Sequence, residues 1–97
     1  MHYLGIDAGA SATKWALINE NGPVASGVRE AMDGHLYRDS SLDRMRKVLS
    51  EISKEIKGTK VDSVFMGITG VVHDGSINRE IDKVFKSSSK VVSDIEL

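Results

Sequence analysis

Residues 7–14 have the types and spacing that phosphate chemistry requires. Asp7 follows the short apolar run of residues 3–6 (YLGI), and residues 8–12 (AGASA) carry no bulky side chain. A ligand can therefore approach the backbone there, and exposed N–H groups can donate hydrogen bonds to its phosphate oxygens. Three further residues supply hydroxyl groups or positive charge: Ser11, Thr13 and Lys14.

Asp7 is the candidate metal ligand of this stretch. Mg²⁺ dehydrates reluctantly and often binds through only one or two carboxylates, so we expect Asp7 to hold it through water. A phosphate loop beside such an acid suits phosphoryl transfer, in which catalysis is mostly positioning and charge neutralisation. The alternative is a β-hairpin with a small-residue loop and a turn-capping Asp7. The candidate phosphate-binding set is Asp7, Gly9, Ala10, Ser11, Thr13 and Lys14.

The elements that must position this stretch follow from periodicity and turn signals. Strands are predicted over residues 3–6, 13–18, 23–30, 61–67 and 90–97, the last ending near Asp94, with a hairpin turn at Asn21-Gly22. Apolar residues at helical spacing predict a helix from Ser40 or Ser41 to Lys57 and a second one over 77–86, capped by Ser76. The fold class is therefore α/β, with the order β-β-β-α-β-α-β and helices packed on a mixed sheet.

Composition narrows the class of protein. The 97 residues fit one small domain, and 13 basic against 14 acidic residues, interleaved along the chain, give no nucleic-acid surface. The absence of cysteine excludes disulfides and thiol chemistry within this stretch. No apolar run reaches membrane-spanning length, and the N-terminus lacks a signal-peptide pattern, so we expect a cytoplasmic protein without a membrane partner.

The segment GIDAGASATKWALINENG resembles the first phosphate motif of the actin and sugar-kinase superfamily. It is most similar to the BadF/BadG/BcrA/BcrD ATPase family, whose pattern is roughly G-I-D-G-G-G-T-K-T-K. Five residues fall on matching positions, whereas three alanines replace the commonest residues there. The matching residues are Asp7, Gly9, Ser11, Thr13 and Lys14, and the departures are Ala8, Ala10 and Ala12. The order of elements resembles half of the core domain of the ribonuclease-H-like, actin-like ATPase fold.

This resemblance implies ATP and Mg²⁺ as cofactors and a sugar as acceptor. Asp94 resembles the aspartate that acts as general base on the sugar hydroxyl; its alternative is an ordinary strand-end acid. Thr69 and Gly70, within the G-I-T-G-V-V-H-D segment, resemble the family's sugar-side loop, although turn geometry alone would explain the glycine. His35 resembles a loop residue near the sugar in N-acetylglucosamine kinases, and its alternative is a surface histidine.

Three functions remain open at this level. The first is the N-terminal domain of an ATP-dependent kinase for N-acetylglucosamine or a similar hexosamine. The second is an ATPase activator of a 2-hydroxyacyl-CoA dehydratase or benzoyl-CoA reductase system. The third is a non-catalytic oligomerisation module.

The superfamily's second phosphate motif and its adenosine motif do not occur in this sequence. In the superfamily the nucleotide lies between two domains, so we expect residues 1–97 to form a single, incomplete N-terminal subdomain lacking the second domain. Alone it should bind ATP weakly or not at all, without turnover. An uncovered sheet edge could also make it a homo-oligomer.

Overall fold

The computed structural model describes residues 1–32, 39–57, 59–68 and 75–93. Five strands and two helices follow one another in the order β-β-β-α-β-α-β, which confirms the predicted fold class. The elements are β1 (Tyr3–Ala8), β2 (Thr13–Asn19), β3 (Gly22–Arg29), α1 (Asp39–Glu55), β4 (Ser63–Ile68), α2 (Ser76–Phe85) and β5 (Ser88–Ser93). Neither described helix is long and apolar enough to cross a membrane.

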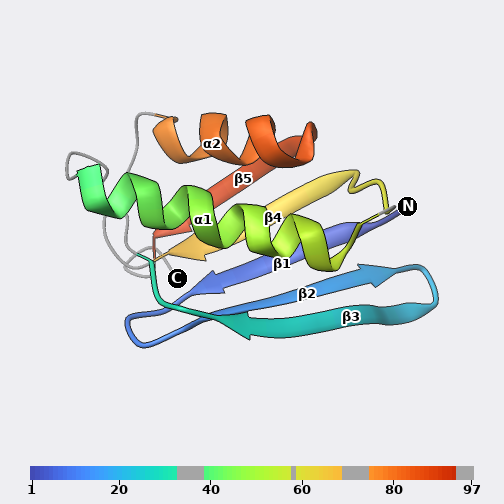
Figure 1. The fold of residues 1–97 in the computed structure, drawn as a ribbon. Helices are drawn as coiled ribbons and strands as arrows, with labels where there is room; N and C mark the ends of the chain where they lie inside the picture. The colour runs from blue at the N-terminus through green and yellow to red at the C-terminus, as the bar shows by residue number, and fades with distance from the viewer. Residues whose placement is uncertain (33–38, 58, 69–74, 94–97) are drawn as a thin grey trace.

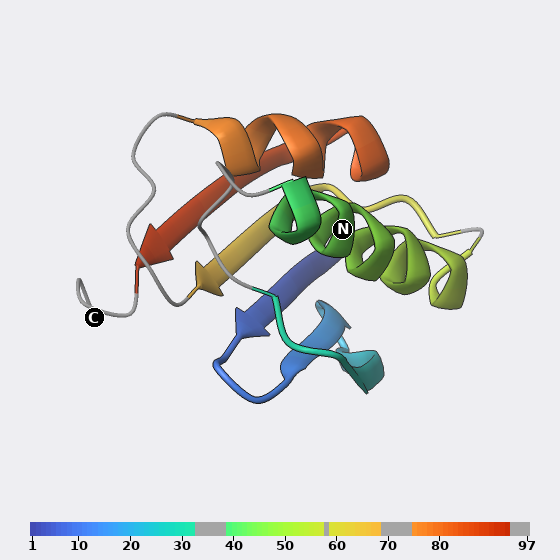
Figure 2. The ribbon, with the colours of Figure 1, turned by 60° about the vertical axis from the view of Figure 1, so that its left-hand side comes forward.

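The five strands form one mixed sheet in the order β3-β2-β1-β4-β5 (Figure 1). The pairs β1–β2 and β2–β3 are antiparallel, whereas β1–β4 and β4–β5 are parallel. The parallel strands therefore end together, at Ala8, Ile68 and Ser93, on what we call the carboxyl edge of the sheet. The loop between β1 and β2 lies at the same edge, and both helices begin there (Figures 1 and 2).

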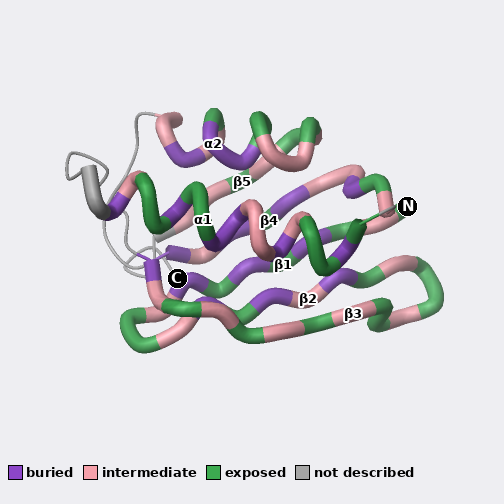
Figure 3. The backbone as a smooth tube through the Cα atoms, viewed as in Figure 1, coloured by how far each residue is buried: buried purple, intermediate pink, exposed green. Residues whose placement is uncertain are grey.

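Both helices pack on one face of the sheet and leave the other face uncovered by any described element (Figures 1 and 2). Strand residues alternate between these faces, as the burial pattern of β1 shows, so every second side chain enters the core (Figure 3). The fully buried core side chains include Leu4, Leu17, Met45, Leu49, Ile52, Met66, Ile68, Ile77 and Ile81. The apolar residues at helical spacing that predicted α1 are buried in the structure, except Leu42, which is only half-buried.

Most predicted element boundaries differ from the structure by one or two residues, and two of these differences have a clear physical cause. Gly75, not Ser76, occupies the N-cap of α2, in a left-handed conformation (φ 80°) that glycine adopts without strain. The last strand is predicted to begin at Lys90, but β5 already begins at Ser88, which pairs with Ser63. Parallel pairing with β4 outweighs the weak strand preference of serine there.

A close approach between β2 and β3 lets the indole of Trp15 lie over Gly27. A Cβ atom at Gly27 would lie 2.7 Å from Trp15 Nε1 and 2.9 Å from Cε2 and Cζ2. We therefore expect Gly27→Ala to lower the free energy of unfolding by about 1–3 kcal/mol, through displacement of the indole. Chemical denaturation measures this. Gly67→Ala is the matched control, because nothing lies within 4 Å of a Cβ there; an equal loss in both variants would contradict the packing.

Glu80 joins the two helices through an ion pair and is the one buried carboxylate among the described residues (8% exposed). Its Oε1 accepts a hydrogen bond from Arg46 Nε at 2.9 Å, and Lys83 Nζ lies 3.3 Å from Oε2. The hydrogen bond from Arg46 is the largest cause that lowers the pKa of Glu80 from its ordinary value of 4.5; burial opposes it, and Lys83 assists.

Because the pKa of Glu80 is lowered in the folded state, its stabilising contribution is complete above about pH 4.5 and is lost as the pH falls through the folded-state pKa. We expect Glu80→Gln to destabilise the protein at neutral pH and to flatten the acid limb of the stability curve. Thermal unfolding as a function of pH measures both. Glu51→Gln, at a position without an ion pair to a described residue, should leave that limb unchanged; a steep limb in Glu80→Gln would refute the assignment.

Candidate functional site

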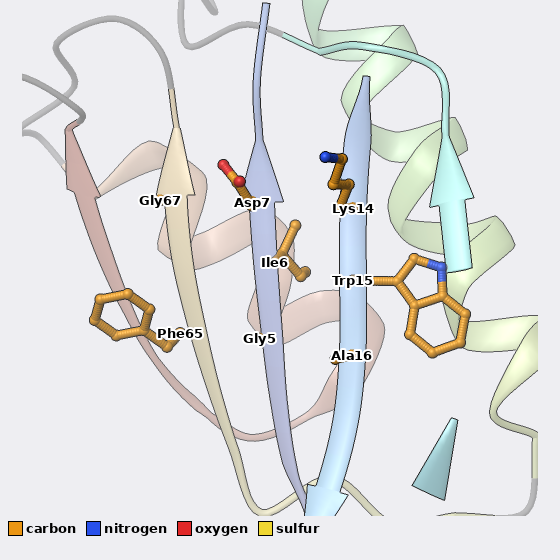
Figure 4. A pocket seen from close by; sticks show the side chains of 8 residues that line it. All are labelled: Gly5, Ile6, Asp7, Lys14, Trp15, Ala16, Phe65 and Gly67. Carbon is orange, nitrogen blue, oxygen red and sulfur yellow. The ribbon is translucent and has the colours of Figure 1, made fainter. Parts of the chain in front are cut away.

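Asp7 and Lys14 lie side by side on adjacent strands, close to the carboxyl edge. Asp7 is the residue before the end of β1, and its partners across the sheet are Lys14 of β2 and Gly67 of β4. Its neighbours Ile6 and Ala8 are buried under the helices, so alternation turns Asp7 to the uncovered face. Figure 4 shows the Asp7 carboxylate and the Lys14 ammonium extending toward the same edge.

The two charges are adjacent but not paired. Both side chains are exposed, and neither forms an ion pair with any residue in the described part of the chain. A carboxylate that is free of a competing cation can hold a hydrated metal ion, and a free ammonium can attract an anion. Asp7 and Lys14 together can therefore bind a ligand that combines a metal ion with an anion, such as a metal-bound phosphate.

The loop of residues 9–12 offers hydrogen-bond donors beside this pair. Gly9 closes the loop by donating its N–H to the Ala12 carbonyl at 3.0 Å. The amides of Ala10, Ser11 and Ala12 make no hydrogen bond to a described residue. A Cβ at Gly9 would approach the Ala12 oxygen to 3.2 Å, so this tight turn favours glycine. The loop thus presents consecutive N–H groups that donate to no described residue, together with the exposed Ser11, as an oxyanion requires.

Thr13 occupies a different position from the other predicted phosphate ligands. It faces the helices, is completely buried, and its Oγ1 has no hydrogen-bond partner among the described residues. Alternation is the reason: Thr13 pairs with the buried Ala8, whereas the next residue, Lys14, pairs with Asp7. The hydroxyl therefore lies beneath the loop, and its contact with a phosphate stays a prediction.

The predicted sugar-side residues and the predicted base lie outside the described residues: His35, Thr69, Gly70 and Asp94. The structure does place the strand ends that precede two of these segments, Ile68 of β4 and Ser93 of β5, at the carboxyl edge with Asp7. The chain therefore leaves β4 and β5 at the same edge of the sheet as Asp7, as a site shared by Asp7 and the residues that follow these strands would require.

Sequence reasoning missed a cavity of about 460 Å³ on the uncovered face. It is lined by Gly5, Ile6, Asp7, Lys14, Trp15, Ala16, Phe65 and Gly67 (Figure 4). The small residues at 5, 16 and 67 create the hollow, and Phe65 forms one wall. Gly67, predicted as the last residue of its strand, lies within β4, which continues to Ile68. The sequence signal that could have revealed the cavity is a small residue at an outward-facing position of each of the strands β1, β2 and β4.

No cluster of three or more metal-binding side chains occurs in the described ranges, which leaves Asp7 as a lone carboxylate.

No protein-family model and no curated protein matches this sequence. Solved structures do match. The chain is similar to a ROK hexokinase from Thermus thermophilus (TM-score 0.67, 13% identity), covering 97% of this chain and 34% of that one. It is also similar to a ROK-family transcriptional regulator homologous to the E. coli MLC protein (TM-score 0.73, 17% identity, 96% and 28% covered). A third match is a proposed N-acetylmannosamine kinase from Listeria monocytogenes (TM-score 0.62, 18% identity, 97% and 35% covered).

These likenesses establish the fold. The chain has the ribonuclease-H-like, actin-like ATPase fold, in the extent of one half-domain. It spans about a third of the length of each of these three structures. The site defined by Asp7, Lys14 and the loop of residues 9–12 lies at the carboxyl edge, where open α/β sheets bind their ligands.

Proposed function

We propose that this chain is the phosphate-binding N-terminal lobe of an ATP-dependent sugar kinase. One observation carries the proposal: at the carboxyl edge of the sheet, Asp7 and Lys14, unpaired with each other, flank a loop whose N–H groups at residues 10–12 donate to no described residue. Two of the structural neighbours are described as sugar kinases, which supports the same reading.

In this proposal each group has a separate task. Asp7 holds Mg²⁺ through water, and a single exposed carboxylate fits an ion that keeps most of its waters. The bound ion would neutralise charge on the nucleotide's phosphates. Lys14, Ser11 and the amides of the loop, Ala10 among them, take the phosphate oxygens, whereas Gly9, whose N–H donates to the Ala12 carbonyl, keeps the turn tight. Thr13 supports the loop from below and reaches the phosphates only if the loop shifts.

The finer assignments rest on the resemblance of the sequence. The acceptor is a hexosamine such as N-acetylglucosamine, and the branch is the BadF/BadG/BcrA/BcrD family. Asp94 is the general base, and His35, Thr69 and Gly70 contact the sugar. The ATPase activator of a dehydratase or reductase system is the second function that the same phosphate motif could serve.

Titration of the isotope-labelled chain with Mg·ATP, followed through its amide resonances, tests the proposal. We expect shifts confined to residues 7–14 and an affinity no tighter than about millimolar, because a single lobe makes few contacts with the nucleotide. Inorganic tripolyphosphate should reproduce the shifts, and adenosine should not. Shifts centred elsewhere, or caused equally by adenosine, would overturn the assignment.

A further inference from the structure

Three buried polar atoms on the helix-covered face of β2 and β3 share one property. The Thr13 hydroxyl oxygen, the Trp15 indole nitrogen Nε1 and the Arg29 Nε each lack a hydrogen bond to any described residue. Thr13 is 0% exposed and Trp15 is 4% exposed, so both side chains are almost entirely removed from bulk water. Because a buried polar atom without a partner is costly, three of them in one region need a common explanation.

The strand register brings these side chains together. Thr13 and Arg29 are directly opposite each other on β2 and β3, and Trp15 is opposite Gly27. Opposite residues of an antiparallel pair point to the same face, with Cβ atoms about 4.5–5.5 Å apart. Trp15 follows Thr13 by two residues and Arg29 follows Gly27 by two, so all four positions share the face that the helices cover.

The directions of two side chains narrow the remaining gap. The indole extends from β2 toward β3, and its Nε1 lies 2.7 Å from the place of a Cβ atom at Gly27 (Figure 4). Arg29 forms an ion pair with Glu55, the last residue of α1. Since α1 begins at the carboxyl edge, Glu55 lies toward the opposite edge (Figure 1). The Arg29 side chain therefore runs back along β3, toward Gly27 and the indole.

Hydrogen-bond valence identifies the group that can join the three atoms. The indole N–H and the guanidinium Nε–H can only donate, whereas the hydroxyl oxygen can also accept. A water molecule accepts one bond from Trp15 and one from Arg29, and it donates one to Thr13. About three bonds to otherwise unpaired groups are usual for a buried water. An anion fits less well, because Glu55 already neutralises Arg29 and an uncompensated buried charge is costly.

From these observations we propose that one buried water molecule is bound between β2 and β3 by Thr13, Trp15 and Arg29. Thr13 and Trp15 flank Lys14 in β2. The water therefore ties to β3 the strand segment that carries this exposed lysine. The three polar atoms are buried by the described part of this chain itself. The inference thus depends neither on the uncovered face of the sheet nor on the proposed phosphate function.

Water-selective NMR of the isotope-labelled chain tests the inference first. Trp15 is the only tryptophan in the sequence, so its indole N–H gives one unambiguous resonance. We expect a nuclear Overhauser cross-peak between this proton and water, with the sign of a long-lived complex. Absence of the cross-peak, or the sign of rapidly exchanging surface water, would overturn the inference. A saturable shift of the indole resonance on addition of chloride would overturn it too, because an anion would then occupy the site.

Two conservative variants distinguish a bound water from exchange of the hydroxyl proton. Thr13→Val keeps the size of the side chain and removes the exchangeable hydroxyl, but two donors remain, so the cross-peak should persist. Arg29→Lys keeps the charge beside Glu55 and places a methylene where Nε–H was. Both changes together leave the water one partner, which is too few to hold it.

We therefore expect the cross-peak to disappear in the double variant, while its dispersed amide resonances show that the fold is retained. Loss of the cross-peak in Thr13→Val alone would mean that the hydroxyl proton, and not a water, produced it. An unchanged cross-peak in the double variant would refute the assignment of the water to these three side chains.

Discussion

Replacing Asp7 with Asn is expected to remove the Mg²⁺-dependent part of nucleotide binding. The amide keeps the size of the side chain but carries no charge, so a hydrated Mg²⁺ loses its only protein carboxylate among the described residues at this site. We expect the apparent affinity for Mg·ATP to fall at least about tenfold, toward that of ATP in the presence of a chelator, since each tenfold step corresponds to 1.4 kcal/mol. Amide-resonance titrations with and without Mg²⁺ measure both values.

A matched pair of lysine variants isolates the phosphate part of the same site. Lys14→Gln should weaken binding of ATP and of tripolyphosphate alike, because its ammonium lies beside the loop of residues 9–12. Lys90→Gln removes the same charge from an exposed position of β5 on the same face, two strands away from Asp7. We expect it to bind as the unmodified chain does. Equal losses in both variants would mean that only the overall charge of this face matters.

Truncation of Leu49 is expected to have the largest effect on stability. Leu49 is completely buried on α1, in the core that the helices form over the sheet. Leu49→Ala removes apolar contacts and leaves a cavity, which costs about 2–5 kcal/mol of the free energy of unfolding. A domain of this size has only about 5–15 kcal/mol in total, so the variant should unfold at a markedly lower denaturant concentration.

Arg44→Ala on the exposed side of the same helix is the control for that measurement. Its side chain makes no ion pair with a described residue, and alanine keeps the helix propensity, so we expect a change within about 0.5 kcal/mol. Should Leu49→Ala prove as mild as Arg44→Ala, α1 would not pack on the sheet as described.

The order of elements was predictable because each element carries a strong local signal. The apolar stripe of α1 and the alternation of buried residues in β1 and β2 are periodic, and periodicity reports directly which face is buried. The same alternation separates Asp7 from Thr13 across the two faces of the sheet. That separation follows from the pairing of Ala8 with Thr13, which the sequence motif does not reveal.

The remaining features depend on contacts between distant segments. The start of β5 at Ser88 is set by its pairing with β4. The lowered pKa of Glu80 is caused mainly by its hydrogen bond from Arg46, 34 residues away. The intrinsic preferences of the individual residues predict neither the start of β5 nor the contact between Glu80 and Arg46. The cavity on the uncovered face likewise needs Gly5, Ala16 and Gly67 to be neighbours across three strands, which only the register establishes.

The phosphate role of the loop between β1 and β2 is tested most directly by paramagnetic broadening. Mn²⁺ replaces Mg²⁺ in complexes with ATP and broadens the amide resonances of nearby residues. We predict strong broadening at Asp7, Ala10 and Ser11, none at the Asn21–Gly22 turn at the opposite edge, and loss of the effect in Asp7→Asn. Broadening that is centred away from the carboxyl edge, or that persists unchanged in Asp7→Asn, would contradict the proposed site.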